Sequence, residues 1–306
     1  MVERTTCMSL LWLMLRGRAL CKRDRLDVFW GAMTILPPLS RSTRAVVTVY
    51  DLIHMDRELV TLKRWLSHKL LYTRSLSRAH SIIAISETTA EKLYNALGYR
   101  CTTIVRPGVS EQYRPYSFHY VQPCLRLYGI QMPYIFAVVS SCEPRKNLRS
   151  LLEAFAGLLD DKLFSRHSLI LAGSGGLAAN KMSDFARLVQ SGAVRSLGHV
   201  RDYQLALLYR GSAVSVCPST HEGFGLPVLE ARACGATVVA TDIPELREAG
   251  GKDAIYTQPS AAGIRAGIIQ ALTEVQQRRI TLPLSYRWYH SGARLAQVLL
   301  DAAARS

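Results

Sequence analysis

The sequence predicts an α/β protein of two doubly wound domains, each with a parallel sheet covered by helices on both faces. The chain has 306 residues, of which 49% are hydrophobic and only 20% charged, enough to build two buried cores. Short apolar runs rich in β-branched residues alternate with longer stretches of helical periodicity. A stretch rich in proline and glycine with no steady period, residues 107–133, interrupts this alternation.

The first half of the chain supplies three predicted strands, at residues 45–50, 81–85 and 102–105. A helix between the last two begins at Ser86, a typical N-cap, and ends at Gly98. The opening strand and glycine-rich loop of an ordinary Rossmann-like domain have no counterpart, as though Met1 were not the true start. We therefore expect residues 1–120 to form a Rossmann-like domain that is incomplete at its N-terminus, followed by a linker at 121–133.

The second half supplies a complete alternation of strands and helices. Predicted strands lie at residues 134–139, 168–172, 213–217 and 237–240, with helices at 148–160, 202–210 and 228–234. Residues 134–282 should thus form a complete Rossmann-like domain. Trp288, Leu295, Val298 and Leu299 have helical spacing, so residues 283–306 should form a closing helix.

The charge and cysteine content limit the partners and the compartment. A net charge of +15, with many arginines in the first half, favours phosphates or an anionic membrane surface, or is simply a solvated basic face. No nucleic-acid-binding motif is present. Seven cysteines without a C-x-x-C pair suggest neither a disulfide framework nor a zinc site, which fits the cytoplasm. The apolar and basic residues 10–25 could lie peripherally on a membrane as an amphipathic helix, or pack as an interior helix.

The segment from Ser219 to Glu230, S-T-H-E-G-F-G-L-P-V-L-E, carries the clearest chemistry. It follows a predicted strand and runs into a helix, where Pro227 suits the first turn and Gly225 permits a close ligand approach. Free amides at such a helix start attract a phosphate or diphosphate. Glu222 lies in the loop and Glu230 in the helix, so they face different parts of one ligand, unlike the carboxylate pair of a hydrolase.

Two glutamates separated by seven residues around G-F-G-L-P resemble the signature of the retaining glycosyltransferases of family 4, which have the GT-B fold. Further segments match in order: E-P-R-K-N at 143–147, L-A-G at 171–173, and A-C-G at 233–235. The resemblance extends from Asp27 onward. It is closest to members that add mannose or related sugars to bacterial surface polysaccharides.

The resemblance implies that residues 1–120 are the acceptor-side domain and residues 134–282 the nucleotide-sugar-binding domain. It also implies roles for matching residues. Glu222 is similar to the glutamate that contacts the transferred sugar, and Glu230 to the one that binds the ribose hydroxyls. Arg145 and Lys146 resemble the cations that hold the diphosphate. The loop residues Gly223, Phe224, Gly225 and Leu226 would complete donor binding with backbone groups. The implied donor is a nucleotide-diphosphate sugar, with GDP-mannose the candidate, and the acceptor is a glycan or lipid-linked oligosaccharide. The configuration would be retained without a cofactor or a metal ion.

One position departs from the family pattern. Tyr50 and Asp51 stand on the candidate acceptor side, where the family commonly has histidine and aspartate. Tyrosine is a poor general base at neutral pH, and His54 is a possible substitute. A catalytically impaired, truncated remnant that still binds a nucleotide sugar is therefore the main alternative, and a nucleotide-sugar epimerase is a weaker one. The glycines at 173, 175 and 176 are only a weak signal for a phosphate-binding turn.

Overall fold

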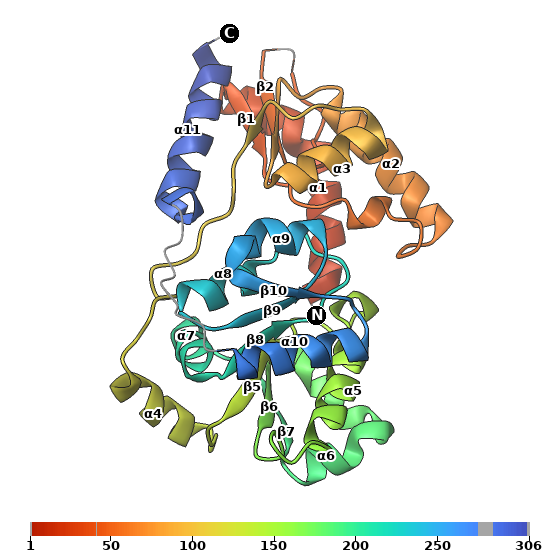
Figure 1. Cartoon of the computed structure of the whole chain (residues 1–306). Coiled ribbons are helices and arrows are strands. Elements are labelled where there is room, and N and C mark those ends of the chain that lie inside the picture. The colour runs from red at the N-terminus through yellow and green to blue at the C-terminus, as the bar shows by residue number, and fades with distance from the viewer. Residues whose placement is uncertain (1, 41, 275–283, 305–306) are drawn as a thin grey trace. The chain divides into compact units, whose positions relative to one another are not determined.

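The computed structural model describes residues 2–40, 42–274 and 284–304, and contains two parallel sheets flanked by helices (Figure 1). Residue contacts divide the chain into two units. Unit 1 consists of residues 1–108 and 288–306, and unit 2 of residues 109–287. The predicted fold class, α/β with two parallel-sheet domains, is confirmed.

Unit 1 is built on a four-stranded parallel sheet with the order β1-β2-β3-β4. The strands are β1 (Val28–Gly31), β2 (Arg44–Val49), β3 (Ser81–Ala84) and β4 (Thr103–Ile104). The helices are α1 (Val2–Arg23), α2 (Leu62–Leu76), α3 (Glu87–Leu97) and α11 (Trp288–Ala304).

Alternation along β2 explains why helices cover both faces of this sheet. Val47 belongs to a buried cluster with Leu76 of α2 and Leu93 of α3. Its neighbour Val46 belongs to another cluster, with Val298 of α11. Successive side chains of a strand point to opposite faces, so one strand reaches both helical layers. The C-terminal helix therefore closes the core of unit 1.

The ends of α3 are as predicted. The Ser86 hydroxyl accepts a hydrogen bond from the Thr89 amide at 2.9 Å, which satisfies a backbone donor of the first turn. Gly98 ends the helix with φ of 75°, a left-handed conformation that favours glycine.

Unit 2 is built on a six-stranded parallel sheet with the order β10-β9-β8-β5-β6-β7. The strands are β5 (Tyr134–Val138), β6 (Ser168–Ala172), β7 (Val194–Gly198), β8 (Val214–Cys217), β9 (Val238–Thr241) and β10 (Ala254–Thr257). The helices are α4 (Phe118–Leu127), α5 (Leu148–Leu159), α6 (Ala186–Gln190), α7 (Asp202–Gly211), α8 (Leu226–Ala233), α9 (Pro244–Gly250) and α10 (Ala261–Thr273).

The two faces of this sheet carry different helices. Ile135 of β5 lies in one buried cluster with Phe155 of α5 and Ile268 of α10. Phe136, the next residue, faces Tyr209 of α7 with the ring centroids 5.1 Å apart. The sheet is thus covered on both faces, as a doubly wound sheet requires.

The strand order places a switch point between β5 and β8. From β5 the chain winds outward through β6 and β7, then returns to β8 on the other side of β5 and winds outward again. In such sheets the loops after the two strands at the switch point separate, and ligands bind in the crevice at the carboxyl ends. Residues 139–147 and 218–225 form these two loops in unit 2.

The unit boundaries differ from the predicted domain bounds. Residues 121–133, expected as a linker, lie in unit 2 and include most of α4. The reason is packing on α7: the Tyr128 hydroxyl donates to the Gln204 side chain at 2.9 Å, and Cys124 Sγ lies 4.0 Å from the Gln204 carbonyl oxygen. Residues 275–282, the end of the predicted second domain, and residue 283 lie outside the described residues.

The glycines after β6 are required by the close approach of two loops. A Cβ atom on Gly175 would lie 2.1 Å from the Ser141 carbonyl oxygen, and one on Gly173 2.4 Å from the Val139 carbonyl oxygen. The Gly175 amide also donates to the Val139 carbonyl at 2.9 Å. These glycines therefore hold the β6 loop against the loop that follows β5.

We expect Gly175→Ala to lower the free energy of unfolding by about 1–3 kcal/mol, because backbone atoms must move to admit the methyl group. Gly157→Ala is the matched control. It lies within α5, and its new Cβ would make an ordinary contact, 3.6 Å from Arg265 Cδ, so helix propensity should raise stability by up to about 1 kcal/mol. Urea unfolding measures both; equal effects of the two substitutions would contradict the close-packing account.

Candidate functional site

A sheltered ion pair joins the two loops at the switch point of unit 2. Lys146 Nζ donates to Glu222 Oε1 at 2.6 Å, and the two side chains are only 10% and 11% exposed. Lys146 lies in the 3-10 turn after β5, and Glu222 lies in the loop after β8. A charged group so far removed from water is tolerated only beside an opposite charge, so each residue fixes the position of the other.

Arg145 adds a second cation to the same cluster. Its Nη1 atom lies 3.8 Å from Glu222 Oε2 and donates to the His221 carbonyl at 3.3 Å. Its Nε atom donates to Glu143 at 2.5 Å. The Arg145 carbonyl in turn accepts from the Thr220 amide at 2.8 Å. Side-chain and backbone contacts therefore tie the 143–147 turn to the 219–222 loop.

The helix α8 begins at the end of that loop, as the sequence indicated. Gly225 has φ of 98°, and a Cβ atom there would lie 2.5 Å from a Leu246 side-chain carbon, so no other residue fits without rearrangement. Pro227 occupies the first turn. Phe224 is buried, and Leu226 is partly exposed at the helix start. The loop thus delivers the amino end of α8 to the carboxyl edge of the sheet.

Glu230 lies one turn further along α8, in a less polar setting. Burial raises the pKa of its carboxyl group to about 7, and the negative charge of Asp202 acts in the same direction. The Tyr209 hydroxyl, which donates to Glu230 Oε2 at 3.3 Å, opposes this shift. Tyr209 is itself buried, and burial raises its pKa well above the ordinary value. Glu230 is therefore a carboxyl group that titrates near neutral pH.

Cys217 ends β8 directly before this loop and was not singled out from the sequence. Burial raises the pKa of its thiol to about 12; the nearby charge of Glu222 raises it further, and that of Lys146 lowers it. The thiol therefore stays protonated at neutral pH, and it serves as a small buried side chain rather than a nucleophile.

The predicted acceptor-side residues lie in unit 1, at the carboxyl end of β2. Tyr50 is 46% exposed, and Asp51 accepts a hydrogen bond from the Ile53 amide at 3.2 Å. His54 follows in a short 3-10 turn, and its ring contacts that of His68 with the centroids 4.3 Å apart and the planes tilted by 39°. The structure therefore brings Tyr50, Asp51 and His54 into one loop at the carboxyl edge of the sheet. Open α/β sheets in general bind their ligands at this edge.

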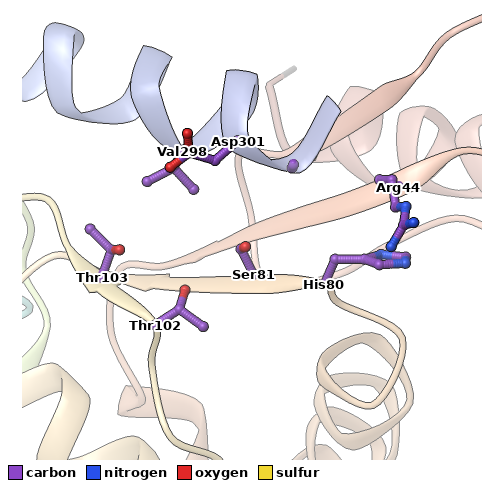
Figure 2. A pocket seen from close by; sticks show the side chains of 8 residues that line it. Arg44, His80, Ser81, Thr102, Thr103, Val298 and Asp301 are labelled. Atoms are coloured by element: carbon purple, nitrogen blue, oxygen red, sulfur yellow. The ribbon is translucent and has the colours of Figure 1, made fainter. Parts of the chain in front are cut away.

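Unit 1 also has a cavity of about 270 Å³ between the sheet and the last turns of α11 (Figure 2). Its lining residues belong to α11 and to the amino-terminal ends of β2, β3 and β4: Arg44, His80, Ser81, Thr102, Thr103, Val298, Asp301 and Ala302. The His80 ring accepts a hydrogen bond from the Ala45 amide at 3.0 Å, and burial lowers its pKa. This cavity is at the opposite edge of the sheet from Tyr50 and Asp51.

Comparison with known proteins identifies the family. Residues 128–281 match the family model described as "Glycosyl transferases group 1". The chain belongs to the group 1 glycosyltransferases. The O-antigen chain mannosyltransferase B of Escherichia coli is 32% identical to it over 271 residues, which cover 87% of this chain and 70% of that protein. A serotype-specific mannosyltransferase of the same organism, WbdA, is 32% identical over 64% of the chain, but that match spans only 25% of the relative.

Solved structures show the same fold at low sequence identity. Sucrose-phosphate synthase of Thermosynechococcus elongatus gives a TM-score of 0.76 at 16% identity, covering 96% of this chain and 78% of that one. HepE of Anabaena, solved in complex with UDP and glucose, gives a TM-score of 0.74 at 16% identity, covering 94% and 81%. The resemblance to glycosyltransferases with the GT-B fold, inferred from the sequence, is thus confirmed.

Among the predicted site residues of the glycosyltransferase, the structure brings Arg145, Lys146 and Glu222 into contact. Glu230 is held separately, by a partner that the sequence did not indicate. Tyr209 lies on α7 among apolar residues and looks from the sequence like an ordinary core position. No helix in the described part of the glycosyltransferase is long and apolar enough to cross a bilayer.

The raised pKa of Glu230 predicts a pH dependence of stability. Between about pH 4.5 and 7 the folded state keeps a proton that the unfolded state has lost, so this group makes stability fall as pH rises through that window, by up to about 3 kcal/mol. Glu230→Gln, which cannot ionise, should remove the fall. In urea unfolding, the free energy of unfolding of the variant should therefore rise relative to that of the parent between about pH 5 and pH 8.

Glu153→Gln is the control for this pH series, because Glu153 lies in an exposed pair with Arg149. The free energy of unfolding of this variant should change with pH in the same way as that of the parent protein. A constant stability difference between Glu230→Gln and the parent over the whole range would contradict the assigned shift.

Proposed function

We propose that the glycosyltransferase moves a hexose, with mannose as the candidate, from a nucleotide-diphosphate sugar to a glycan or lipid-linked acceptor with retention of configuration. The observation that carries the proposal is the cluster of Arg145, Lys146 and Glu222 at the switch point of unit 2. The choice of mannose is supported by relatives named as mannosyltransferases. GDP-mannose is the candidate donor that the sequence resemblance implies.

In the proposed reaction the cations stabilise the leaving diphosphate. A Lys146 ammonium group has three N–H donors, of which the pair with Glu222 needs one. The others, with the Arg145 guanidinium, would bind phosphate oxygens and offset the charge that develops as the glycosidic bond breaks. This arrangement supplies positive charge without a metal ion or cofactor, whose absence from the reaction remains a prediction.

The remaining site residues would bind the other parts of the donor and fix its position. Gly223, Phe224, Gly225 and Leu226 lead into the amino end of α8, where backbone amides and the helix dipole favour a diphosphate. Glu222 would also accept hydrogen bonds from the transferred sugar. Glu230, one turn into the helix, would accept hydrogen bonds from the ribose hydroxyls, more strongly in its ionised form. Each proposed contact uses a group that the fold of unit 2 already holds in place.

Retention would come from attack on the same face that the diphosphate leaves, with a donor phosphate oxygen taking the proton of the acceptor hydroxyl. Tyr50 and Asp51 are the proposed acceptor-side residues. The exposed Tyr50 could donate a hydrogen bond to the acceptor, at a position where the family commonly has a histidine.

Tyr50 is also the observation that favours a second candidate, a protein that binds a nucleotide sugar without transferring the sugar. Incubation with labelled GDP-mannose and other nucleotide sugars, with a polymannose or lipid-linked acceptor, tests the first proposal. We expect a labelled glycan whose new linkage has the anomeric configuration of the donor. Calorimetric binding of GDP with neither transfer nor donor hydrolysis would favour the second candidate. Absence of both binding and turnover would contradict both.

We expect Lys146→Met to lower kcat/KM by about 100–1000-fold, because one donor to the leaving group is lost. The variant should also be destabilised by about 3 kcal/mol, because Glu222 keeps only the longer Arg145 contact. Lys146→Met/Glu222→Gln should recover much of the stability but none of the activity. Lys162→Met, on an exposed turn, is the charge-matched control. Activity that returns with stability in the double variant would show Lys146 to be only structural.

A further inference from the structure

The core between α11 and the sheet of unit 1 gives way to polar residues at the amino-terminal edge of the sheet. Val46 of β2 and Ile83 of β3 belong to the buried cluster that α11 covers. Because side chains alternate along a strand, Arg44 and Ser81, two positions earlier, lie on the same face. Thr103 pairs with Ile83 across the sheet and shares that face. Polar residues at positions that continue a core face are unusual unless they serve a function.

The last turns of α11 lie over these polar residues, and the cavity of about 270 Å³ is found between them (Figure 2). Val298 and Ala302 of α11 are buried and give the cavity an apolar wall. Asp301, on the same helix, adds a carboxylate whose Oδ1 atom accepts a hydrogen bond from Gln297 Nε2 at 2.7 Å. An apolar wall that faces a few convergent polar groups is typical of small-molecule sites.

Arg44 and His80 form the basic end of this cavity. Figure 2 shows their side chains close together, with Thr102 and Thr103 at the other end. The His80 Nδ1 atom accepts a hydrogen bond from the Ala45 amide at 3.0 Å, so the neutral ring carries its proton on Nε2, as a donor. Burial and the charge of Arg44 lower the pKa of His80, so Arg44 supplies the positive charge. A guanidinium fork beside a ring N–H donor suits a phosphate group.

The rest of the cavity offers groups that bind hydroxyls. Thr102 Oγ1 is already bonded to the backbone of Ile82, donating to its carbonyl at 2.9 Å and accepting from its amide at 3.2 Å. The hydroxyls of Ser81 and Thr103 can donate and accept, and the carboxylate of Asp301 accepts. Because Asp301 would repel a second anionic group, the cavity favours a ligand with one phosphate and a neutral, hydroxylated body.

From this arrangement we infer that the cavity binds a phosphorylated monosaccharide, with the phosphate on Arg44 and His80 and the sugar hydroxyls on Asp301 and the strand residues. Its volume is near the lower end of the range for small-molecule sites, which suits one sugar ring better than a nucleotide. The candidate donor site lies in unit 2, so the inference holds whatever sugar the enzyme transfers. A ligand that contacts both α11 and the strands would also stabilise the packing of this helix on unit 1.

The test is isothermal titration calorimetry of the full chain with mannose 6-phosphate, inorganic phosphate and mannose as separate ligands. We expect mannose 6-phosphate to bind at least about tenfold more tightly than either of the others, because each of them makes only part of the contacts. Arg44→Gln should weaken the binding of mannose 6-phosphate about 10–100-fold, through loss of a charge-assisted contact. Asp301→Asn should weaken it about tenfold without weakening the binding of inorganic phosphate.

Two further variants separate this cavity from other basic groups. Arg64→Gln is the matched control, since Arg64 is exposed in the first turn of α2 and does not line the cavity, and it should bind mannose 6-phosphate like the parent. Arg145→Gln removes a cation of the candidate donor site in unit 2 and should also leave this binding unchanged.

Nuclear magnetic resonance of the histidine rings locates the ligand in the parent protein. A bound phosphate offsets the charge of Arg44, so mannose 6-phosphate should raise the pKa of His80, whose signal is identified by its loss in His80→Gln. This measurement on the parent decides the question even where a variant fails to fold, which circular dichroism would reveal.

Four outcomes would overturn the inference. The first is a parent protein that does not bind mannose 6-phosphate, and the second is an unchanged pKa of His80 when the ligand is bound. The third is a change of site, in which Arg44→Gln binds as the parent does or Arg145→Gln abolishes binding. The fourth is inorganic phosphate binding as tightly as mannose 6-phosphate, which would make the cavity a site for a free anion only.

Discussion

The pair of Lys146 and Glu222 is the interaction on which the arrangement of the candidate site depends. The strand order of unit 2 sends the chain in opposite directions after β5 and after β8, so the strand ladder does not join the two loops that follow them. The ion pair and the hydrogen bond from the Thr220 amide to the Arg145 carbonyl make the connection instead. Because both charged groups are sheltered from water, neither loop can move away without exposing or isolating a charge.

Glycines set the backbone distances around that pair. Gly175 allows the β6 loop to touch the loop carrying Ser141, and Gly225 allows α8 to begin close to Leu246. At Gly175 an added Cβ atom would collide with backbone atoms, and at Gly225 the positive φ would strain any other residue. The site therefore depends on small residues for its shape and on a few charged residues for its chemistry.

Those two kinds of residue differ in how well the sequence reveals them. Gly225 and Pro227 correctly predicted the start of α8, and Ser86 and Gly98 correctly predicted the two ends of α3. These predictions succeed because turns and helix caps depend on nearby residues. Strand β7 was missed because polar Arg195 and Ser196 interrupt its apolar pattern, and strand pairing is decided by distant partners.

Long-range contacts also explain two structural arrangements that the sequence left hidden. The partner of Glu230 is Tyr209 on another helix, and no local spacing relates the two. Leu62, Leu66 and Leu70 have the helical periodicity of a core-facing stripe, and only the tertiary fold shows that another side of α2 is buried. Periodicity predicts that a helix has an apolar face, but not which protein or solvent surface that face meets.

The charges at the switch point also indicate which group would move when a diphosphate binds. Arg145 and Lys146 are balanced by Glu143 and Glu222, so a diphosphate must replace part of the existing pairing. Glu143 is 55% exposed, and an ion pair with so exposed a carboxylate contributes little because water and salt screen it. Glu222 is only 11% exposed, and its separation from Lys146 would be costly. Arg145 is therefore the cation that can exchange a carboxylate for a phosphate, while Lys146 keeps its partner and supplies its remaining N–H donors.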